Sequence, residues 1–295
     1  MNYVIFDLEW NQPMDAASTV LDPVYLPGEI VQIGAVKTDS EFNILDRFQL
    51  LIRPVFYPKM HHRIAALTGI YDRQLQQEGL PFQEALRSFL DWCGEDFLFL
   101  NWSESDMIAL VQNMLAHGMD TGELAPFADA QRIFSREVFR TDRRISLEEA
   151  MKAMKEQGDR AHDALHDAEN TAKICRRMDL EDCLEEYRTA IYSIPGAQSC
   201  YDTSRECLDD PALRQVECPW CGSPMECETW VPGKIHPHAT MATCPEGDEY
   251  LLSLTCHRLS DGRVLAERLL FDMSDDLYDR YCDCKEAPEQ SAAPN

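Results

Sequence analysis

The strongest constraint on this sequence is a pair of carboxylates inside an apolar strand. Residues 3–10 are predicted as a buried strand, in which Asp7 and Glu9 stand two positions apart. Because side chains alternate across a strand, both carboxylates point to one face, while Phe6 and Leu8 point to the other. Two carboxylates near a core repel each other and lose hydration, and a divalent cation removes both penalties. The alternative is a pair that lies in water at the end of the strand.

Apolar periodicity predicts an α/β domain over residues 1–180. Further strands are expected at residues 30–37, 44–53 and 97–101, and helices at 82–92, 106–116, 146–155 and 164–178. Ser146 followed by Glu149 fits a capping box at the start of one helix. The remaining chain is divided into a helix and linker at 181–215, a small β-rich Cys-rich domain at 216–284 and a disordered tail at 285–295.

Composition limits the class of protein. The 295 residues include 27 basic and 52 acidic side chains, which gives a net charge of −25. This acidity argues against a protein that coats DNA nonspecifically, but it allows an enzyme that grips one strand end locally. The chain has no predicted signal peptide and no apolar run long enough for a membrane helix. We therefore expect a soluble, cytoplasmic protein with no membrane partner.

Two later motifs carry further chemistry-bearing side chains. Asp106 follows the strand predicted at residues 97–101, at a strand-to-helix junction where carboxylates often cap helices. His162 stands five residues before Asp167, which falls on the first turns of a predicted helix. Taken alone, each motif has an ordinary structural explanation.

The order of these motifs resembles the DEDD superfamily of 3′→5′ exonucleases in its histidine subtype (DnaQ-like), closest to the histone-mRNA exonuclease and KapD-like branch. The Phe-Asp-Leu-Glu opening, a later Asp and a His-x4-Asp helix start carry the resemblance, with support from residues 28–34 and 67–70. The matching residues are Asp7, Glu9, Asp106, His162 and Asp167. The resemblance implies a ribonuclease H-like mixed sheet flanked by helices.

The resemblance also implies a mechanism. Two Mg²⁺ or Mn²⁺ ions would be held by Asp7, Glu9, Asp106 and Asp167, because hard divalent ions prefer oxygen ligands. His162 would be the general base, since it and not His166 stands five residues before an Asp. The implied function is hydrolysis of phosphodiester bonds at the 3′ end of single-stranded RNA, DNA or short oligonucleotides. The alternative is a catalytically inactive or regulatory binding module on the same fold.

Two further places are candidates for substrate contact. Thr68, Gly69 and Ile70 resemble the family stretch that meets the terminal nucleotide, although an ordinary turn after a helix is the alternative. Trp102 is a candidate for stacking on a base, but it is equally compatible with the core.

Arginines recur every four residues at positions 132, 136, 140 and 144. If this stretch is helical, they form a basic stripe that is able to hold a phosphate backbone. Neighbouring acidic residues favour the alternative of a solvated, salt-bridged face.

The C-terminal part contains nine of the twelve cysteines. Without an export signal, local metal binding explains this cluster better than disulfides do. Cys218 and Cys221 form a zinc-knuckle sequence, and Cys244 begins a second, incomplete knuckle, so the domain at residues 216–284 resembles a zinc ribbon. Cys256 is the predicted fourth zinc ligand, and the less favoured candidates are Cys227, His236, His238 and His257; a three-ligand or decayed site stays open. The net acidity of this domain favours a structural role or a protein partner.

Overall fold

The computed structural model describes residues 2–122, 124–158, 162–178, 180, 183–194, 199–233 and 236–286. The chain divides into two compact units, residues 1–188 and residues 189–295. Among the described residues, no helix is long and apolar enough to cross a membrane.

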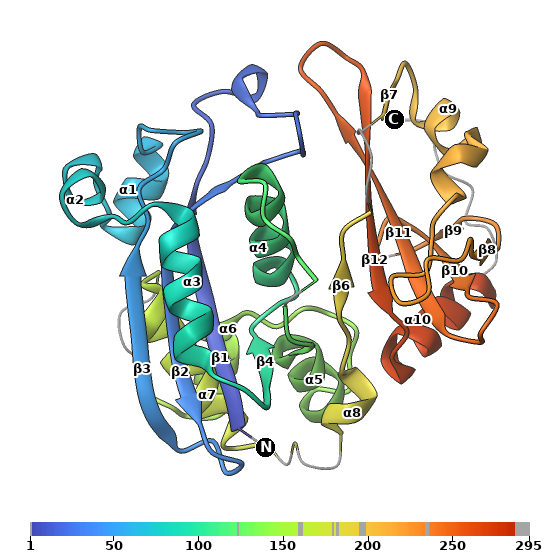
Figure 1. Ribbon diagram of the computed structural model, residues 1–295. Coiled ribbons are helices and arrows are strands. Elements are labelled where there is room, and N and C mark those ends of the chain that lie inside the picture. Colours follow the sequence, from blue (N-terminus) through green and yellow to red (C-terminus); the bar gives the residue numbers. More distant parts are fainter. Residues whose placement is uncertain are drawn as a thin grey trace. The chain divides into compact units, whose positions relative to one another are not determined.

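A five-stranded mixed sheet forms the centre of the first unit (Figure 1). Its order is β3-β2-β1-β4-β5, so β1 lies in the middle. β1 pairs antiparallel with β2 and parallel with β4, and the outer pairs are antiparallel for β2–β3 and parallel for β4–β5. The strands are β1 (Asn2–Asn11), β2 (Glu29–Thr38), β3 (Ile44–Leu51), β4 (Phe97–Asn101) and β5 (Phe127–Asp129).

Helices flank this sheet, which confirms the predicted mixed α/β class. The capping box at Ser146 and Glu149 is present at the start of α6, as predicted. The helices are α1 (His62–Thr68), α2 (Asp72–Glu78), α3 (Phe82–Cys93), α4 (Ser105–Ala116), α5 (Ala130–Ile133), α6 (Leu147–Ala153), α7 (Ala164–Cys175) and α8 (Leu184–Tyr187). A 3₁₀ turn spans Ala16–Ser18, and a π-helical turn spans Phe134–Val138.

The two faces of β1 meet different helices. On one face, the Phe6 ring packs edge-on against Phe89 of α3, with ring centroids 5.5 Å apart. On the other face, Tyr3 and Ile5 share a core cluster with Ala168 and Ala172 of α7. Because residues alternate along the strand, Asp7 and Glu9 must lie on the face that α7 covers.

Gly34 is the reason that α7 can lie so close to the sheet. It pairs with Asp7 in the β1–β2 register, so both positions belong to the same face. A side-chain carbon at Gly34 would overlap the backbone of Ala164 and Leu165 in the first turn of α7. The absence of a side chain at this position therefore lets the start of α7 rest directly on β2 beside the carboxylate pair.

The second unit is built on an antiparallel sheet of order β6-β12-β11-β10-β8, with β7 beside β12 and β9 beside β10. Three of its strands, β10, β11 and β12, are long and pair side by side, which agrees with the β-rich domain predicted at residues 216–284. The strands are β6 (Ile191–Tyr192), β7 (Ser199–Tyr201), β8 (Glu226–Cys227), β9 (Val231–Pro232), β10 (His238–Thr243), β11 (Glu249–Arg258) and β12 (Val264–Asp272).

In the described part of residues 181–215, the predicted helix is present but short (α8), and the stretch predicted as linker contains regular structure. After the short helix α8, Ile191–Tyr192 forms a strand on β12 instead of continuing the helix. Ser199–Tyr201 forms another strand on β12, and it is followed by α9 (Ser204–Asp209) and a 3₁₀ turn (Pro211–Arg214). Strands of two or three residues are too short to show apolar alternation in the sequence. Pairing with a distant strand decides where they form.

A further helix is not among those predicted from the sequence. α10 (Asp275–Glu286) includes the first two residues that had been assigned to a disordered tail. The rest of the predicted tail, residues 287–295, lies outside the described residues.

Replacement of Gly34 by alanine tests the contact between α7 and β2. We expect Gly34→Ala to lower the free energy of unfolding by about 1–3 kcal/mol, because the added carbon meets backbone that cannot rotate away. Chemical denaturation of both proteins measures the difference. Gly122→Ala is the matched control, since its nearest neighbour would be an Asp120 side-chain oxygen at 3.5 Å, and it should change stability by less than about 0.5 kcal/mol. Equal stability of Gly34→Ala and wild type would contradict the proposed packing.

Candidate active site

Asp7 and Glu9 lie side by side on the central strand, as predicted. Phe6 and Leu8 are 1% and 4% exposed in the core, whereas both carboxylates are half-buried on the α7 face. β1 continues to Asn11, so the pair does not lie at a solvated strand end. The alternation expected from the sequence therefore holds.

Asp106 is joined to this pair by a backbone hydrogen bond. β4 pairs with β1 only as far as Ile5 and Leu100, which leaves the next polar groups of β1 without a strand partner on that side. The Asn101 side-chain amide donates to the Phe6 carbonyl at 2.8 Å, and the Leu8 amide donates to Asp106 Oδ1 at 3.1 Å. Asp106 is thus fixed at the start of α4, next to the carboxylates of β1.

The start of α7 brings the last two predicted residues to the same place. Asp163 caps the helix, and the Ala164 amide donates to Gln32 Oε1 of β2 at 3.1 Å. The exposed residue His162 has a φ of 62°, and its amide donates to Asp167 Oδ2 at 2.9 Å. This bond holds His162 against the first turn of the helix.

Glu9, His162 and Asp167 each offer a ligand atom within 4.8 Å of the other two. The three residues come from β1, the segment before α7 and α7 itself. The charge of Asp106 raises the pKa of both Asp7 and Glu9, so Asp7 and Asp106 belong electrostatically to the same group. The structure therefore brings together all five residues that the sequence singled out as catalytic.

Burial and mutual repulsion hold these carboxyl groups toward their protonated forms. Burial raises the pKa of Asp7 well above its usual value, and the charges of Asp106 and Asp167 raise it further. Burial, followed by repulsion from Asp167 and Asp106, raises the pKa of Glu9 to about 8. Burial raises the pKa of Asp106 to about 7, even though the Leu8 amide favours its charged form. The pKa of Asp167 is also raised by burial.

These residues fit a divalent cation. Hard ions such as Mg²⁺ or Mn²⁺ take carboxylate oxygens as ligands, and here such groups converge where burial and mutual repulsion oppose their ionisation. A bound ion would supply positive charge and allow all the carboxyl groups to ionise.

Thr68, Gly69 and Ile70 form the turn that ends α1. Thr68 Oγ1 accepts from the Ile70 amide at 3.1 Å, and Gly69 closes the helix with a φ of 75°. Ile70 is 4% exposed and packs in a core cluster with Val31 and Leu75. This is the geometry of the ordinary helix-ending turn that the sequence left open, and contact with a nucleotide at this turn stays a prediction.

Trp102 occupies the core. It is 8% exposed, its indole N–H donates to the Ile145 carbonyl at 3.1 Å, and its ring packs against Phe134 at 5.5 Å. Little of the ring is left to stack on a base, so the structure favours the core alternative for this residue.

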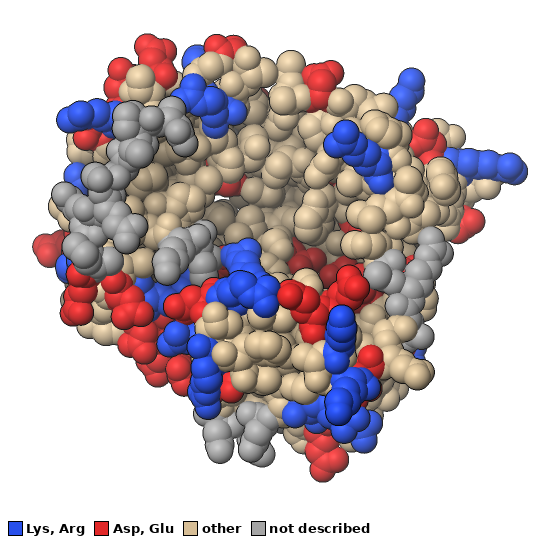
Figure 2. Space-filling model, turned by 180° about the vertical axis from the view of Figure 1, so that it is seen from behind, with Lys and Arg blue, Asp and Glu red and all other residues tan. Residues whose placement is uncertain are grey.

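The four arginines do not form a basic stripe. The chain there passes from α5 into a π-helical turn, and Arg140 has a φ of 52°, so the four residues do not follow one helix. Each lies 3.0 Å from a carboxylate oxygen: Arg132 and Arg136 from Asp142, Arg140 from Glu137, and Arg144 from Glu104. On the face drawn in Figure 2, basic side chains are likewise interspersed with acidic ones. The salt-bridged alternative is therefore the one observed.

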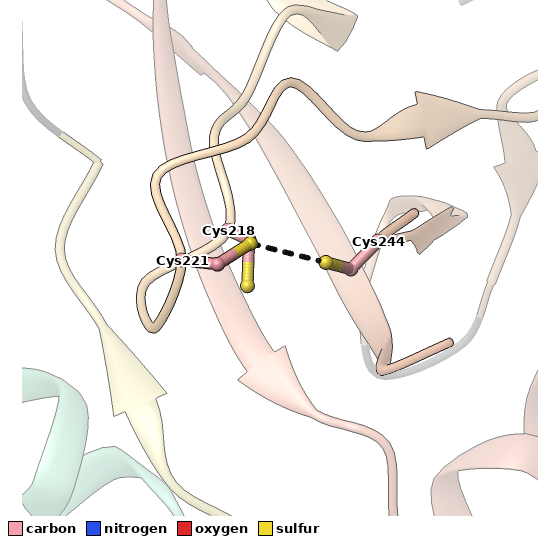
Figure 3. A group of neighbouring side chains, drawn as sticks. All are labelled: Cys218, Cys221 and Cys244. Carbon is pink, nitrogen blue, oxygen red and sulfur yellow. Dashed lines mark hydrogen bonds between the residues drawn. The ribbon is translucent and has the colours of Figure 1, made fainter. Parts of the chain in front are cut away.

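In the second unit, three of the four predicted zinc ligands come together. Cys218, Cys221 and Cys244 each place a sulfur within 4.8 Å of the other two (Figure 3). Cys256, the predicted fourth ligand, does not join them, and its sulfur lies 3.3 Å from that of Cys207. The reason is distance along β11: Tyr250 reaches Cys218 with its hydroxyl, and Cys256 lies six residues, roughly 20 Å, further along this extended strand.

Three residues that position the site were not predicted. Asn101 completes the hydrogen bonding of β1, Gln32 anchors the first turn of α7, and Gly34 admits that turn. A glycine inside an apolar strand is a recognisable sign of close backbone approach. The partners of Asn101 and Gln32 left no signal in the sequence, because they lie 95 and 132 residues away.

Comparison with known proteins identifies a family and several structures of similar fold. The family model described as exonuclease (RNase T) matches residues 4–175, which is more than half of the chain. No curated protein matches the sequence. The nuclease domain of 3′hExo, a DEDDh family member bound to rAMP, has a TM-score of 0.53 at 20% identity over 66% of this chain and 96% of that chain.

Two further solved structures have the same fold. Cell-death related nuclease 4 has a TM-score of 0.51 at 23% identity, over 60% of this chain and 63% of that chain. Exonuclease I of E. coli in complex with a dT13 oligonucleotide has a TM-score of 0.51 at 15% identity, over 86% of this chain and 55% of that chain. The chain thus covers less than two thirds of either protein. These likenesses confirm the ribonuclease H-like exonuclease fold.

The raised pKa values predict how metal binding depends on pH. A carboxyl group whose pKa is raised on folding favours the folded state at low pH, and this contribution is lost as the pH rises from its ordinary pKa of 4.5 to about 8 for Glu9. Divalent ions should restore it, so the Mn²⁺-induced increase in Tm should be larger at pH 8 than at pH 6. Calorimetry with Mn²⁺ or EDTA measures this difference.

Glu9→Gln removes one titrating group, so the Tm measured in EDTA should depend less on pH than that of the wild type. Glu78→Gln, on the exposed end of α2, is the matched control and should keep the wild-type slope. An Mn²⁺ effect of equal size at pH 6 and pH 8 would contradict the assignment of the carboxylates as ligands.

Proposed function

The chain belongs to the RNase T exonuclease family, and from this premise we propose that it is a metal-dependent 3′→5′ exonuclease acting on single-stranded ends. The observation that carries the proposal is the convergence of carboxylates from β1, α4 and α7 with one histidine. None of the acidic ligands that the family pattern requires is missing. An inactive binding module would have no need to keep so repulsive a group together.

Asp7, Glu9, Asp106 and Asp167 would hold two divalent ions. Asp106 Oδ1 already accepts from the Leu8 amide, so one oxygen is committed to the backbone. This favours a role for Asp106 through its other oxygen or through water. When bound, Mg²⁺ or Mn²⁺ supplies positive charge at the phosphate and lowers the pKa of a bound water.

His162 would act as the general base. Its ring offers a nitrogen within 4.8 Å of carboxylate oxygens of Glu9 and Asp167, and its exposed position leaves it accessible to a substrate. The proton of the attacking water would pass to a ring nitrogen and then to solvent. The bond from the His162 amide to Asp167 keeps the imidazole over the carboxylates while it does so. His166, by contrast, lies beside Asp163, with 3.6 Å between Nδ1 and Oδ1.

The charge distribution favours short strand ends over long duplexes as substrates. Nonspecific binding to a duplex grows with the number of phosphates that free lysines and arginines neutralise. This chain has a net charge of −25, and the four arginines of residues 132–144 that were considered for such a role are ion-paired. Related structures hold rAMP, a histone mRNA stem-loop and dT13, so both RNA and DNA ends are candidates.

Removal of one carboxylate tests catalysis and its direction together. We expect Asp7→Asn to lower the rate by roughly 10³-fold or more, because stabilisation by metal ions is worth several kcal/mol. A 5′-labelled single strand incubated with Mn²⁺ should give a ladder of shortened products, and a 3′-labelled strand should give labelled mononucleotide only. Asp91→Asn, exposed on α3, is the matched control and should keep wild-type activity. Internal cleavage, or full activity of Asp7→Asn, would refute the proposal.

Separate replacement of His162 and His166 by alanine shows which of the two is the general base. His162→Ala should lower kcat by about 10²–10⁴-fold, since that is the usual contribution of a general base. It should keep the Mn²⁺-induced increase in Tm, because the carboxylates remain. His166→Ala should retain most activity. If His166→Ala is the more damaging change, the assignment of the base is wrong.

A further inference from the structure

Two glycine-containing turns in the second unit present cysteine sulfurs to one point. In the first turn, the Cys218 amide donates to the Ser223 carbonyl and the Gly222 amide donates to the Cys218 carbonyl, both at 2.9 Å. In the second, the Cys244 amide donates to the Asp248 carbonyl at 2.8 Å. The glycine of each turn, Gly222 or Gly247, adopts a positive φ of 69° or 101°. Both turns are therefore closed by their own backbone, with the sulfurs free to face each other.

The distances between these sulfurs suit zinc. Sulfurs bound tetrahedrally at about 2.3 Å from Zn²⁺ lie about 3.8 Å apart. Here all three sulfurs lie within 4.8 Å of one another, and those of Cys221 and Cys244 are 3.4 Å apart (Figure 3). Cys218 and Cys244 are each only 2% exposed, whereas Cys221 is exposed. A metal would have one open side, next to Cys221.

Neighbouring donors can stabilise sulfur in its charged form. The Glu246 amide donates to the Cys244 sulfur at 3.5 Å, and the Tyr250 hydroxyl lies 3.5 Å from the Cys218 sulfur. Hydrogen bonds of this kind around a metal site orient the ligands and spread the charge of the thiolates.

The other candidates for a fourth ligand are placed elsewhere. The His257 ring is 2.8 Å from Glu267, and the His236 ring packs against Phe271 at 4.9 Å. His238 begins β10, five residues and roughly 17 Å of extended chain before Thr243, which precedes Cys244. Among the described residues, no fourth His, Cys, Asp or Glu joins the group of three.

We propose that Cys218, Cys221 and Cys244 bind one Zn²⁺ ion and leave its fourth position open to solvent. The three thiols release their protons to solvent as the metal binds. The fourth position would take water or a small imidazole or thiolate ligand, as in zinc sites with three protein ligands. This replaces the four-cysteine site expected from the sequence by its three-ligand alternative, and it does not depend on nuclease activity.

Cobalt substitution of the full-length protein tests this site without interference from the carboxylates. Co²⁺ added to the reduced, metal-free protein should give a thiolate-to-metal charge-transfer band that saturates at one ion per chain, and one equivalent of Zn²⁺ should remove it. Cys221→Ser should abolish or strongly weaken the band. Because Cys221 is exposed, its replacement should leave the fold intact. Cys256→Ser is the matched control and should keep the full band.

Imidazole then probes the open position. It should shift the visible bands of the cobalt protein while the charge-transfer band persists. Failure of the reduced wild type to form the band would overturn the zinc site. Loss of the band in Cys256→Ser, or visible bands that imidazole leaves unchanged, would overturn the open three-ligand arrangement.

Discussion

Repulsion among buried carboxyl groups is the interaction around which the first unit is organised. Asp7 shares its surroundings with Glu9, Asp106 and Asp167, and burial makes each charge harder to carry. The fold offsets part of this repulsion with amide donors from Leu8 and His162, and with the helix start that holds Asp106. Divalent ions would offset the remainder, so the repulsion that destabilises this unit also favours the proposed metal binding.

Satisfaction of backbone polar groups ties the site to the sheet. β4 stops pairing with β1 at Ile5, and the side chains of Asn101 and Asp106 take over the bonds that a longer strand would have made. Asp106 therefore has two roles, since it completes the hydrogen bonding of the central strand and adds a carboxylate to the candidate site. A unit built in this way cannot move its acidic residues without loosening its own sheet.

The second unit uses a different device to fix its chemistry. Its cysteines stand in short turns closed by backbone bonds and positive-φ glycines, next to a core that includes Tyr250 and Leu252. Successive residues of an extended strand lie far apart, and Cys256 is therefore distant from the three cysteines because it lies further along β11 than Tyr250 does. The same unit recruits β6 and β7 from a stretch that has no strand pattern of its own.

The sequence by itself determined the main strands and helices of the first unit and the candidate catalytic residues. Alternation along residues 3–10 placed Asp7 and Glu9 on one face, and the order of the later motifs identified Asp106, His162 and Asp167, because these signals are local and periodic. Tertiary structure alone decided what depends on contacts between distant residues. Gly34 lets α7 approach the sheet, and the side chains of Asn101 and Gln32 bond to backbone groups far away in the sequence. The arginines of residues 132–144 form ion pairs with acidic residues, and Trp102 is buried in the core. Cys256 lies beside Cys207 and not beside the other zinc ligand candidates. Periodicity records which face a residue occupies, and only packing fixes which distant residue it meets.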